Sequence, residues 1–188
     1  TICNGSRDCA SSATFTAGSE NATAGGVVSV PITVAPSAGE TSTDVNAYAI
    51  AISYDSSVLT PVVKGTDEVG DNTYATVGDS FNSGVLTADL KDNETGDDEV
   101  LIGWAAASPV NVTEASTLAT VDFTVNANAT GSTDVKVVVA QVANSASALA
   151  DASTIEAAAG TVTVDTAFIW GDVDDSKTVT AEDSNTVL

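Results

Sequence analysis

The 188-residue sequence contains no histidine and no methionine, only two cysteines, and only five basic residues against 26 acidic ones. Without histidine there is no Ser-His-Asp triad, no Cys-His pair and no imidazole metal ligand, so the commonest routes to hydrolysis and to zinc or copper binding are excluded. Paired carboxylates such as Asp97 and Asp98 can perform acid–base chemistry, but acidic residues are so abundant that no spacing singles out one pair. We therefore do not expect an enzyme.

Basic side chains are scarce, and the formal net charge is −21. A charge this negative repels phosphate backbones and anionic lipid surfaces, because nucleic-acid binders gain affinity from clustered lysines and arginines. The longest apolar run is also far shorter than the roughly 20 residues that a membrane-spanning helix needs. We therefore expect neither nucleic-acid binding nor membrane insertion.

Hydrophobic residues make up 43% of the chain and charged residues only 16%, so the sequence lacks the signature of a disordered acidic tail. Its length suits one domain of about 150 residues with appendages, which is enough to bury a core. The sequence begins at Thr1 without a signal-peptide pattern, and we interpret it as a processed or trimmed product.

Two small features indicate an extracellular or cell-surface protein. Cys3 and Cys9 have no second pair to complete a thiolate metal site, and a disulfide closing this short loop is favoured over two free thiols. Five Asn-X-Ser/Thr sequons, somewhat more than chance supplies, are candidate glycosylation sites: Asn4, Asn21, Asn93, Asn111 and Asn128. Two explanations of the acidic excess are equally favoured. The protein comes from a halophilic source, where acidic surfaces stay hydrated in high salt, or it is an acidic extracellular protein with calcium-binding loops.

Period-two alternation of apolar residues dominates the sequence and predicts β-strands. The clearest sets run through 28–34, 48–54 and 121–125, and further strands are expected over 85–90, 100–106, 135–140 and 161–164. Pro31 predicts a sheet edge or a bulge in the first set. The alanine-rich stretch 143–159 is also interpreted as extended, because Gly160 and neighbouring valines oppose a helix. About nine short strands separated by turn-forming residues indicate an all-β jelly-roll or β-sandwich.

The most specific motif is GDVDDSKTVTAEDSNTVL at 171–188. Counted from the first Asp, oxygen ligands fall at positions one, three, five, seven, nine and twelve of a twelve-residue calcium loop, namely Asp172, Asp174, Ser176, Thr178 through its carbonyl, Thr180 through water, and Asp183. Three carboxylates with neutral oxygens suit a hard cation, and calcium is favoured over an ordinary acidic turn. For two other acidic stretches, 65–72 and 90–99, solvated turns are favoured over calcium sites.

This motif resembles the first repeat of a dockerin, the calcium-dependent docking module of cellulosome-type assemblies. The matching residues are Gly171, Asp172, Asp174, Val179, Thr180 and Asp183. The resemblance implies a calcium loop that leads into a short helix, with Ala181 and Glu182 at positions that read the partner. Ser176 and Lys177 depart from the dockerin pattern, and the sequence holds one of the two repeats that a dockerin normally carries.

The preceding sequence resembles a cohesin, the partner of dockerins. Five segments carry the likeness in the family's order: GGVVSVPITV (25–34), IAISYDSSVLTPVV (50–63), LIGWAAAS (101–108), STLATVDFTV (116–125) and AAGTVTV (158–164). The resemblance implies a nine-stranded flattened sandwich, one face of which receives a dockerin. The chain then divides into an N-terminal segment 1–12, a cohesin-like sandwich 13–165 and a dockerin-like half-module 166–188.

One predicted strand departs from the cohesin pattern. Cohesins tend to present polar residues outward just before the Tyr-Asp pair, whereas this strand has Ala47, Ala49 and Ala51 at the outward positions and is apolar on both faces. Either another element or subunit covers the outer face, or recognition depends on the packing of small residues.

These features favour a non-catalytic, calcium-stabilised assembly module with a protein partner; one candidate partner is a second copy of the chain, joined head to tail into a filament or scaffold. The alternative is a carbohydrate-binding module with a polysaccharide partner. Such a module needs exposed aromatic rings, and the chain has nine aromatic residues. We expect Trp104 in the core and Trp170 packing the tail onto the sandwich, which leaves Tyr74 and Phe81 as loop candidates for a sugar site.

Overall fold

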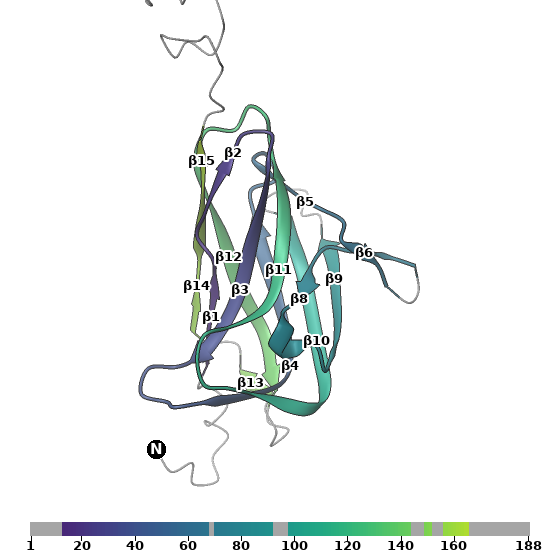
Figure 1. Cartoon of the computed structure of the whole chain (residues 1–188), viewed down its shortest axis with the longest axis vertical. Helices are drawn as coiled ribbons and strands as arrows, with labels where there is room; N and C mark the ends of the chain where they lie inside the picture. The colour runs from purple at the N-terminus through teal and green to yellow at the C-terminus, as the bar shows by residue number, and fades with distance from the viewer. Residues whose placement is uncertain (1–12, 68–69, 92–97, 144–148, 152–155, 166–188) are drawn as a thin grey trace, which may run out of the picture.

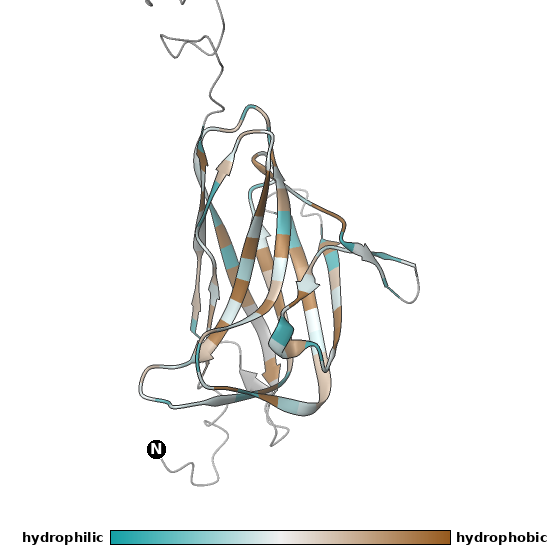
Figure 2. Ribbon diagram, in the orientation of Figure 1, coloured by the Kyte–Doolittle hydropathy of each residue, from teal (hydrophilic) through white to brown (hydrophobic). Residues whose placement is uncertain are grey.

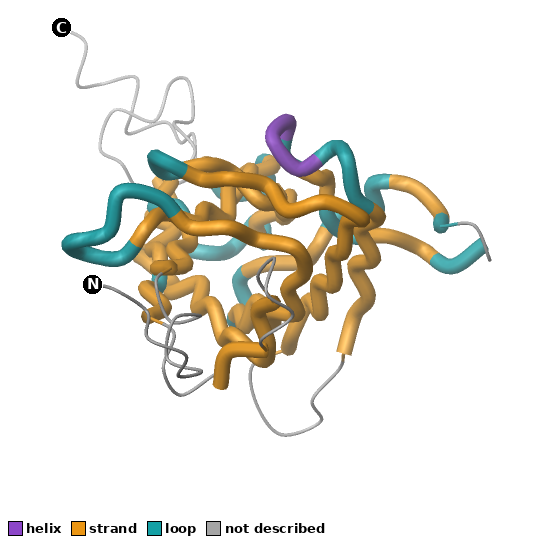
Figure 3. The backbone as a smooth tube through the Cα atoms, turned by 90° about the horizontal axis from the view of Figure 1, so that it is seen from below, coloured by secondary structure: helices purple, strands orange, loops and turns teal. Residues whose placement is uncertain are grey.

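The computed structural model describes residues 13–67, 70–91, 98–143, 149–151 and 156–165. Within these ranges the chain forms fifteen strands and one 3-10 turn, η2 (Asp79–Phe81). Two sheets pack face to face as a flattened sandwich, which confirms the predicted all-β class (Figure 1, Figure 3). The strands outnumber the nine expected because several contain only two to four residues. The segment 1–12 and the predicted C-terminal loop and helix lie outside the described residues.

The first sheet has the strand order β14-β1-β3-β11-β5. Its strands are β14 (Glu156–Ala158), β1 (Ala13–Ala17), β3 (Val27–Pro36), β11 (Ser116–Val125) and β5 (Leu59–Pro61), with β8 (Thr76–Val77) also paired to β11. Neighbours pair antiparallel except β1 and β14, which run parallel.

The second sheet has the strand order β2-β15-β12-β4-β10-β9. Its strands are β2 (Glu20–Thr23), β15 (Gly160–Asp165), β12 (Gly131–Ala143), β4 (Thr43–Tyr54), β10 (Asp98–Val112) and β9 (Val85–Lys91), with β13 (Leu149–Asp151) paired to β12. A separate hairpin of β6 (Gly65–Thr66) and β7 (Asn72–Thr73) projects from the side of the sandwich (Figure 1). No helix of the described ranges is long and apolar enough to cross a membrane.

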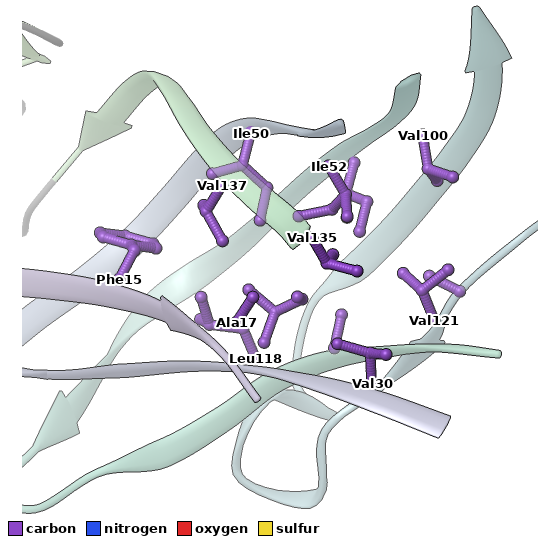
Figure 4. Packing of buried hydrophobic residues seen from close by; sticks show 14 of the residues in the cluster. Phe15, Ala17, Val30, Ile50, Ile52, Val100, Leu118, Val121, Val135 and Val137 are labelled. Carbon is purple, nitrogen blue, oxygen red and sulfur yellow. The ribbon is translucent and has the colours of Figure 1, made fainter. Parts of the chain in front are cut away.

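The core lies between the sheets and is built from the inward set of each strand. Apolar and polar residues alternate along the strands in Figure 2, as the period-two pattern predicts. Val30 and Val121 of the first sheet face Ile52 and Val100 of the second in the tightly packed interior of Figure 4. Each of these four side chains is completely buried. The sandwich is therefore held mainly by aliphatic packing between its layers.

Pro31 does not mark a sheet edge, because β3 lies between β1 and β11. The Pro31 carbonyl accepts a hydrogen bond from the Gly18 N–H at 2.8 Å, just beyond Ala17, where β1 ends. A Cβ on Gly18 would lie 2.7 Å from the proline Cδ, so the ring fits beside β1 only because residue 18 is glycine. A register shift does occur nearby, but in β11, between Thr117 and Ala119.

Candidate interaction surface

The central strand β4 presents a row of alanines on the outer side of the second sheet. Ala47, Ala49 and Ala51 alternate with the buried inward residues of the strand and are themselves only half-buried. Among the described elements, β4 has its main contacts with β10 and β12, its neighbours in the sheet. The structure thus confirms that β4 is apolar on both faces.

The strands beside β4 extend this apolar region. Residues paired across antiparallel strands share one face of a sheet, so the register identifies the neighbours of each alanine. The outward residues of β10 are Leu101, Gly103 and Ala105, and those of β9 are Val85, Thr87 and Asp89. In β12, Val138, Gln141 and Ala143 are in register with Ala51, Ala49 and Ala47. Three of them are exposed aliphatic side chains: Val85 (75%), Val138 (52%) and Leu101 (38%). We call this surface, together with Ala47, Ala49 and Ala51, the alanine face.

Charged side chains of both signs border one end of the alanine face. The next row of the register consists of Lys91, Glu99, Ser53 and Lys136, from β9, β10, β4 and β12 in that order. The Lys91 Nζ lies 3.0 Å from Glu99 Oε2. With Asp89, the side chains at this border amount to two lysines against two carboxylates, whereas at the other end of β4 the outward residue Asp44 pairs with Asn111 of β10.

The outer face of the first sheet differs, because threonine and serine occupy most of its outward positions, with Val27, Pro31 and Ala35 of β3 as apolar exceptions. Thr16 pairs with Thr33, and Ser29 of β3 pairs with Asp122 of β11. The Asp122 carboxylate also accepts a hydrogen bond from Lys64 Nζ. Water solvates such a polar face well, so no partner is needed to cover it. The alanine face is therefore the better candidate for docking.

Partial burial alone would raise the pKa of Asp122, but hydrogen bonds from Lys64 and Ser29 and the Lys64 charge hold it below its ordinary value. For Tyr48, burial raises the pKa of the phenol well above its ordinary range. Neither group faces the alanine face, since Tyr48 points into the core.

Within the described ranges, the aromatic side chains are buried or half-buried. Trp104 is buried, as expected, and its Nε1–H donates to the Phe81 carbonyl at 2.9 Å. The prediction that Phe81 lies exposed in a loop is wrong, because η2 turns its ring into the core beside Tyr48 and Trp104. Tyr74 is half-buried and lines a pocket. The described surface therefore offers no exposed ring for stacking a sugar.

Some of the other predicted site residues lie inside the described ranges and some lie outside them. The calcium-loop residues Asp172 to Asp183, both cysteines, and the sequons at Asn4 and Asn93 lie outside them. The remaining sequon asparagines, Asn21, Asn111 and Asn128, are exposed. The Asn111 amide donates to Asp44 Oδ1 at 2.7 Å, whereas Asn128 lies in the turn after β11.

Neither acidic stretch supplies a metal site where it is described. Asp67 Oδ1 accepts the Asp71 backbone N–H at 2.9 Å, so its carboxylate closes the turn between β6 and β7. Across the described ranges, no three His, Cys, Asp or Glu side chains are grouped as metal ligands.

Sequence reasoning identified the β4 alanines but missed Val85, Leu101 and Val138. Each of them stands at an alternating position of a predicted strand, so their outward orientation was available. The sequence alone could not predict that these three residues lie on one surface, because this depends on which strands pair with β4 and in what register.

No family model matches the chain, and no curated protein matches it. Among solved structures, it is similar to a non-cellulosomal cohesin from the hyperthermophilic archaeon Archaeoglobus fulgidus, with 17% identity and a TM-score of 0.59 over 81% of this chain and 91% of that one. The seventh ScaB type I cohesin of Pseudobacteroides cellulosolvens has 18% identity and a TM-score of 0.59, over 84% of this chain and 95% of that one. A chain of a type I cohesin–dockerin complex from Clostridium thermocellum has 12% identity and a TM-score of 0.62, over 82% and 99%. The fold is thus the flattened β-sandwich of cohesin modules.

Proposed function

We propose that the chain is a non-catalytic protein-binding module of an extracellular or cell-surface assembly, and that the alanine face is its docking surface. The contrast between the two outer faces carries this proposal. One sheet shows mainly threonine, serine and Asp122 to solvent, with Val27 as its exposed aliphatic side chain, while the centre of the other shows alanine, glycine and three exposed aliphatic side chains. An apolar patch of this kind on an acidic protein is typical of an interaction site.

The alanine face favours recognition by close packing. Ala47, Ala49 and Gly103 have almost no side chain, so the backbone of a partner can approach the middle of the sheet. Val85 and Val138 stand on either side of this floor and offer aliphatic contacts. Interfaces gain their energy from such water-excluding contacts at the centre, with polar groups at the rim.

Similar solved structures support a protein as the partner. The Clostridium thermocellum structure is a cohesin–dockerin complex, and the sixth cohesin of Acetivibrio cellulolyticus scaffoldin B, with 12% identity and a TM-score of 0.54, was also solved with a dockerin. By analogy with these complexes, the partner of this chain is a small protein module.

We extend the proposal to calcium and to a second copy of the chain. The oxygen donors of Asp172, Asp174 and Asp183, with Ser176, Thr178 and Thr180, form the ligand set of a calcium loop. If the segment 166–188 of one copy binds the alanine face of the next, the copies join head to tail, and such a contact builds a filament when the rotation does not close.

Carbohydrate binding is the weaker proposal. Sugar sites use exposed aromatic rings, and within the described ranges Tyr74 is the least buried aromatic residue, with its ring half-covered in a pocket. Retarded migration of the chain through polysaccharide gels would nevertheless favour it.

Self-association of the full chain, followed by sedimentation velocity over a range of concentrations, tests the proposed function. Calcium should promote association, and a chelator should reverse it. Ala49→Glu places a charge in the middle of the alanine face and should abolish association, while Thr16→Glu on the polar face of the first sheet should leave it unchanged. Association that Ala49→Glu does not weaken contradicts the docking role of the face. A chain that stays monomeric throughout contradicts a second copy as the partner.

A further inference from the structure

Three of the five sequons lie within the described ranges, and the fold holds them in different ways. Asn21 and Asn111 belong to the strands β2 and β10, whereas Asn128 lies in the turn between β11 and β12. A glycosyl transferase has to draw the asparagine and the hydroxyl residue of a sequon into its own active site. A sequon on a surface turn is therefore a better acceptor than one held in a sheet.

Asn111 is held by its strand and by its side chain. β10 pairs with β4, and Asn111 lies opposite Asp44 in this register. The Asn111 amide donates to Asp44 Oδ1 at 2.7 Å, so the nitrogen that would bond to a sugar already has a charged partner. Val112, the middle residue of the sequon, is 2% exposed and packs in the core. This sequon reaches a transferase only if the end of β10 leaves the sheet.

Asn21 is exposed, but it is also part of a sheet. β2 pairs in parallel with β15, with Asn21 opposite Thr163 and Thr23 opposite Asp165. Ala22, the middle residue of the sequon, belongs to the core. The side chains of Asn21 and Thr23 are exposed, but the backbone between them has to separate from β15 before it can bend into an enzyme.

Asn128 occupies the corner of a tight turn. The Ala129 N–H donates to the Asn126 carbonyl at 3.0 Å, which makes 126–129 a β-turn with Asn128 at its third position. The Asn128 backbone N–H donates to Asn126 Oδ1 at 2.9 Å. Among the described residues, none bonds the Asn128 side-chain amide, and both Asn128 and Thr130 are exposed. This sequon therefore presents both of its recognised side chains without the opening of any strand.

Contacts on the inner side of this turn fix its position. The Asn126 side-chain amide donates to the Ser57 carbonyl at 3.2 Å, and the Asn126 N–H donates to the Val58 carbonyl at 2.8 Å. Ala129 packs against the core. Asn128 is thus presented at a defined point of the surface.

That point lies at the end of the sandwich where β15 finishes. β12 begins three residues after Asn128, and its first residue, Gly131, pairs with Val164 of β15. In Figure 1 the chain between β11 and β12 passes over the upper end of the molecule, beside the end of β15. Val138, which belongs to the alanine face, is seven residues further along β12 than Gly131, or about 23 Å. Residues 166–188, Trp170 among them, lie outside the described residues.

We propose that Asn128 carries an N-linked glycan and that folding protects Asn21 and Asn111 from modification. The proposal rests on the extracellular or cell-surface placement given above. The Asn128 amide nitrogen attacks C1 of an oligosaccharide carried on a polyprenyl-linked phosphate. The N–C1 bond forms, the C1–O bond to the carrier breaks, the amide proton passes to a base of the transferase, and the carrier phosphate leaves. Because a glycan is bulky and hydrated, it keeps other proteins off this end of the sandwich and leaves docking to the alanine face.

Glycosyl transfer to the purified full chain tests the proposal. The folded chain, made in a host without N-glycosylation, is incubated with a lipid-linked oligosaccharide and a single-subunit transferase that requires only Asn-X-Ser/Thr. Peptide mass spectrometry follows the occupancy of each sequon. Asn21 and Asn128 begin the same tripeptide, Asn-Ala-Thr, so a difference between their rates comes from the fold. We expect the initial rate at Asn128 to exceed the rates at Asn21 and Asn111 by at least about tenfold.

Two controls separate the fold from the sequon itself. Synthetic peptides that span the three sequons lack the fold, and their rates should lie within about threefold of one another. In the full chain, Thr130→Ala removes the hydroxyl that the transferase recognises and should abolish transfer to Asn128. Thr130→Ser keeps the hydroxyl and should retain transfer. Residue 130 is exposed, so neither change disturbs the core.

A second measurement uses the chain isolated from its source. Peptide mass spectrometry should find a glycan on Asn128 and unmodified side chains at Asn21 and Asn111. Equal rates at Asn21 and Asn128 in the folded chain, or an unmodified Asn128 in the chain from its source, overturn the proposal. Ala49→Glu lies on the alanine face and should be glycosylated at Asn128 as efficiently as the native chain, so this test is independent of the proposed docking role of that face.

Discussion

The indole of Trp104 lies against the backbone of Gly84, so closely that a Cβ on Gly84 would stand 2.4 Å from the indole Nε1. The same indole donates to the Phe81 carbonyl and stacks on the ring of Tyr48, with centroids 5.6 Å apart. One side chain of β10 thereby holds both η2 and the start of β9. Because β9 contributes Val85 and Thr87 to the alanine face, this contact also positions one side of the proposed docking surface.

Gly84→Ala should therefore destabilise the fold. The added methyl group cannot fit without moving Trp104 or the Ala105 carbonyl, which lies 2.6 Å from its position. Overpacking of this kind costs about 1–3 kcal/mol. Urea unfolding should show the loss, and the near-UV circular dichroism of the indole should weaken. Gly65→Ala is the control, since its Cβ would meet its nearest neighbour at 3.9 Å. Equal stability of the two variants would contradict the close packing.

Asp122 should make stability depend on pH through its contact with Lys64. Because the folded-state pKa lies below the ordinary value of 3.8, the ionised carboxylate stabilises the fold above that pH. The stabilisation is lost as the pH falls through the lower, folded-state pKa. Asp122→Asn should cost about 1 kcal/mol at pH 7, and this cost should shrink progressively as the pH falls below 3.8. Lys64→Met should show the same loss, and the double variant little more than either one. A deficit that persists unchanged in acid would indicate a packing defect instead.

Salt should stabilise the chain markedly. Twenty-six acidic residues against five basic ones repel each other in the compact state. Raising NaCl from about 0.1 M to about 1 M shortens the screening length from about 10 Å to about 3 Å and weakens this repulsion. Each 1 kcal/mol gained raises the melting temperature of a domain of this size by about 2–4 °C. The same salt series near the isoelectric point of about 4.1 should give a much smaller rise. A salt effect of equal size at both pH values would point away from charge repulsion.

The inward faces of the strands were predictable because burial imposes a period of two on the sequence. Ile50 and Ile52 are 2% and 0% exposed, as the alternation requires, and β4 ends at Tyr54, before the predicted Asp55 turn. Phe81 was not predictable in this way, since its neighbours Asp79, Ser80 and Asn82 resemble an exposed loop. Only the tertiary contact with Trp104 shows that η2 belongs to the core.

The candidate site was predictable in part for the same reason. The β4 alanines are visible in the sequence as a second apolar set, but Val138 joins them only through the pairing of β12 with β4. That pairing links segments more than 80 residues apart in the chain. Pro31 shows the same limit, because its place inside the sheet depends on Gly18, which belongs to a different segment of the chain.

Calcium binding by the segment 166–188 should be measurable on the full chain by titration calorimetry after chelator treatment. Three carboxylates in a loop with Ser176 at position five predict an affinity in the range of about 10⁻⁴ to 10⁻³ M that is typical of extracellular modules. Asp183→Asn removes the charge at position twelve and should weaken binding at least tenfold, which is about 1.4 kcal/mol. Asp165→Asn, at the end of β15 and outside the motif, should leave the affinity unchanged. If Asp183→Asn binds calcium as well as the native chain, the carboxylates act as a diffuse acidic surface and the loop assignment is wrong. If binding is lost only in Asp183→Asn, the loop is the calcium site, and its effect on self-association can be assigned to one ion.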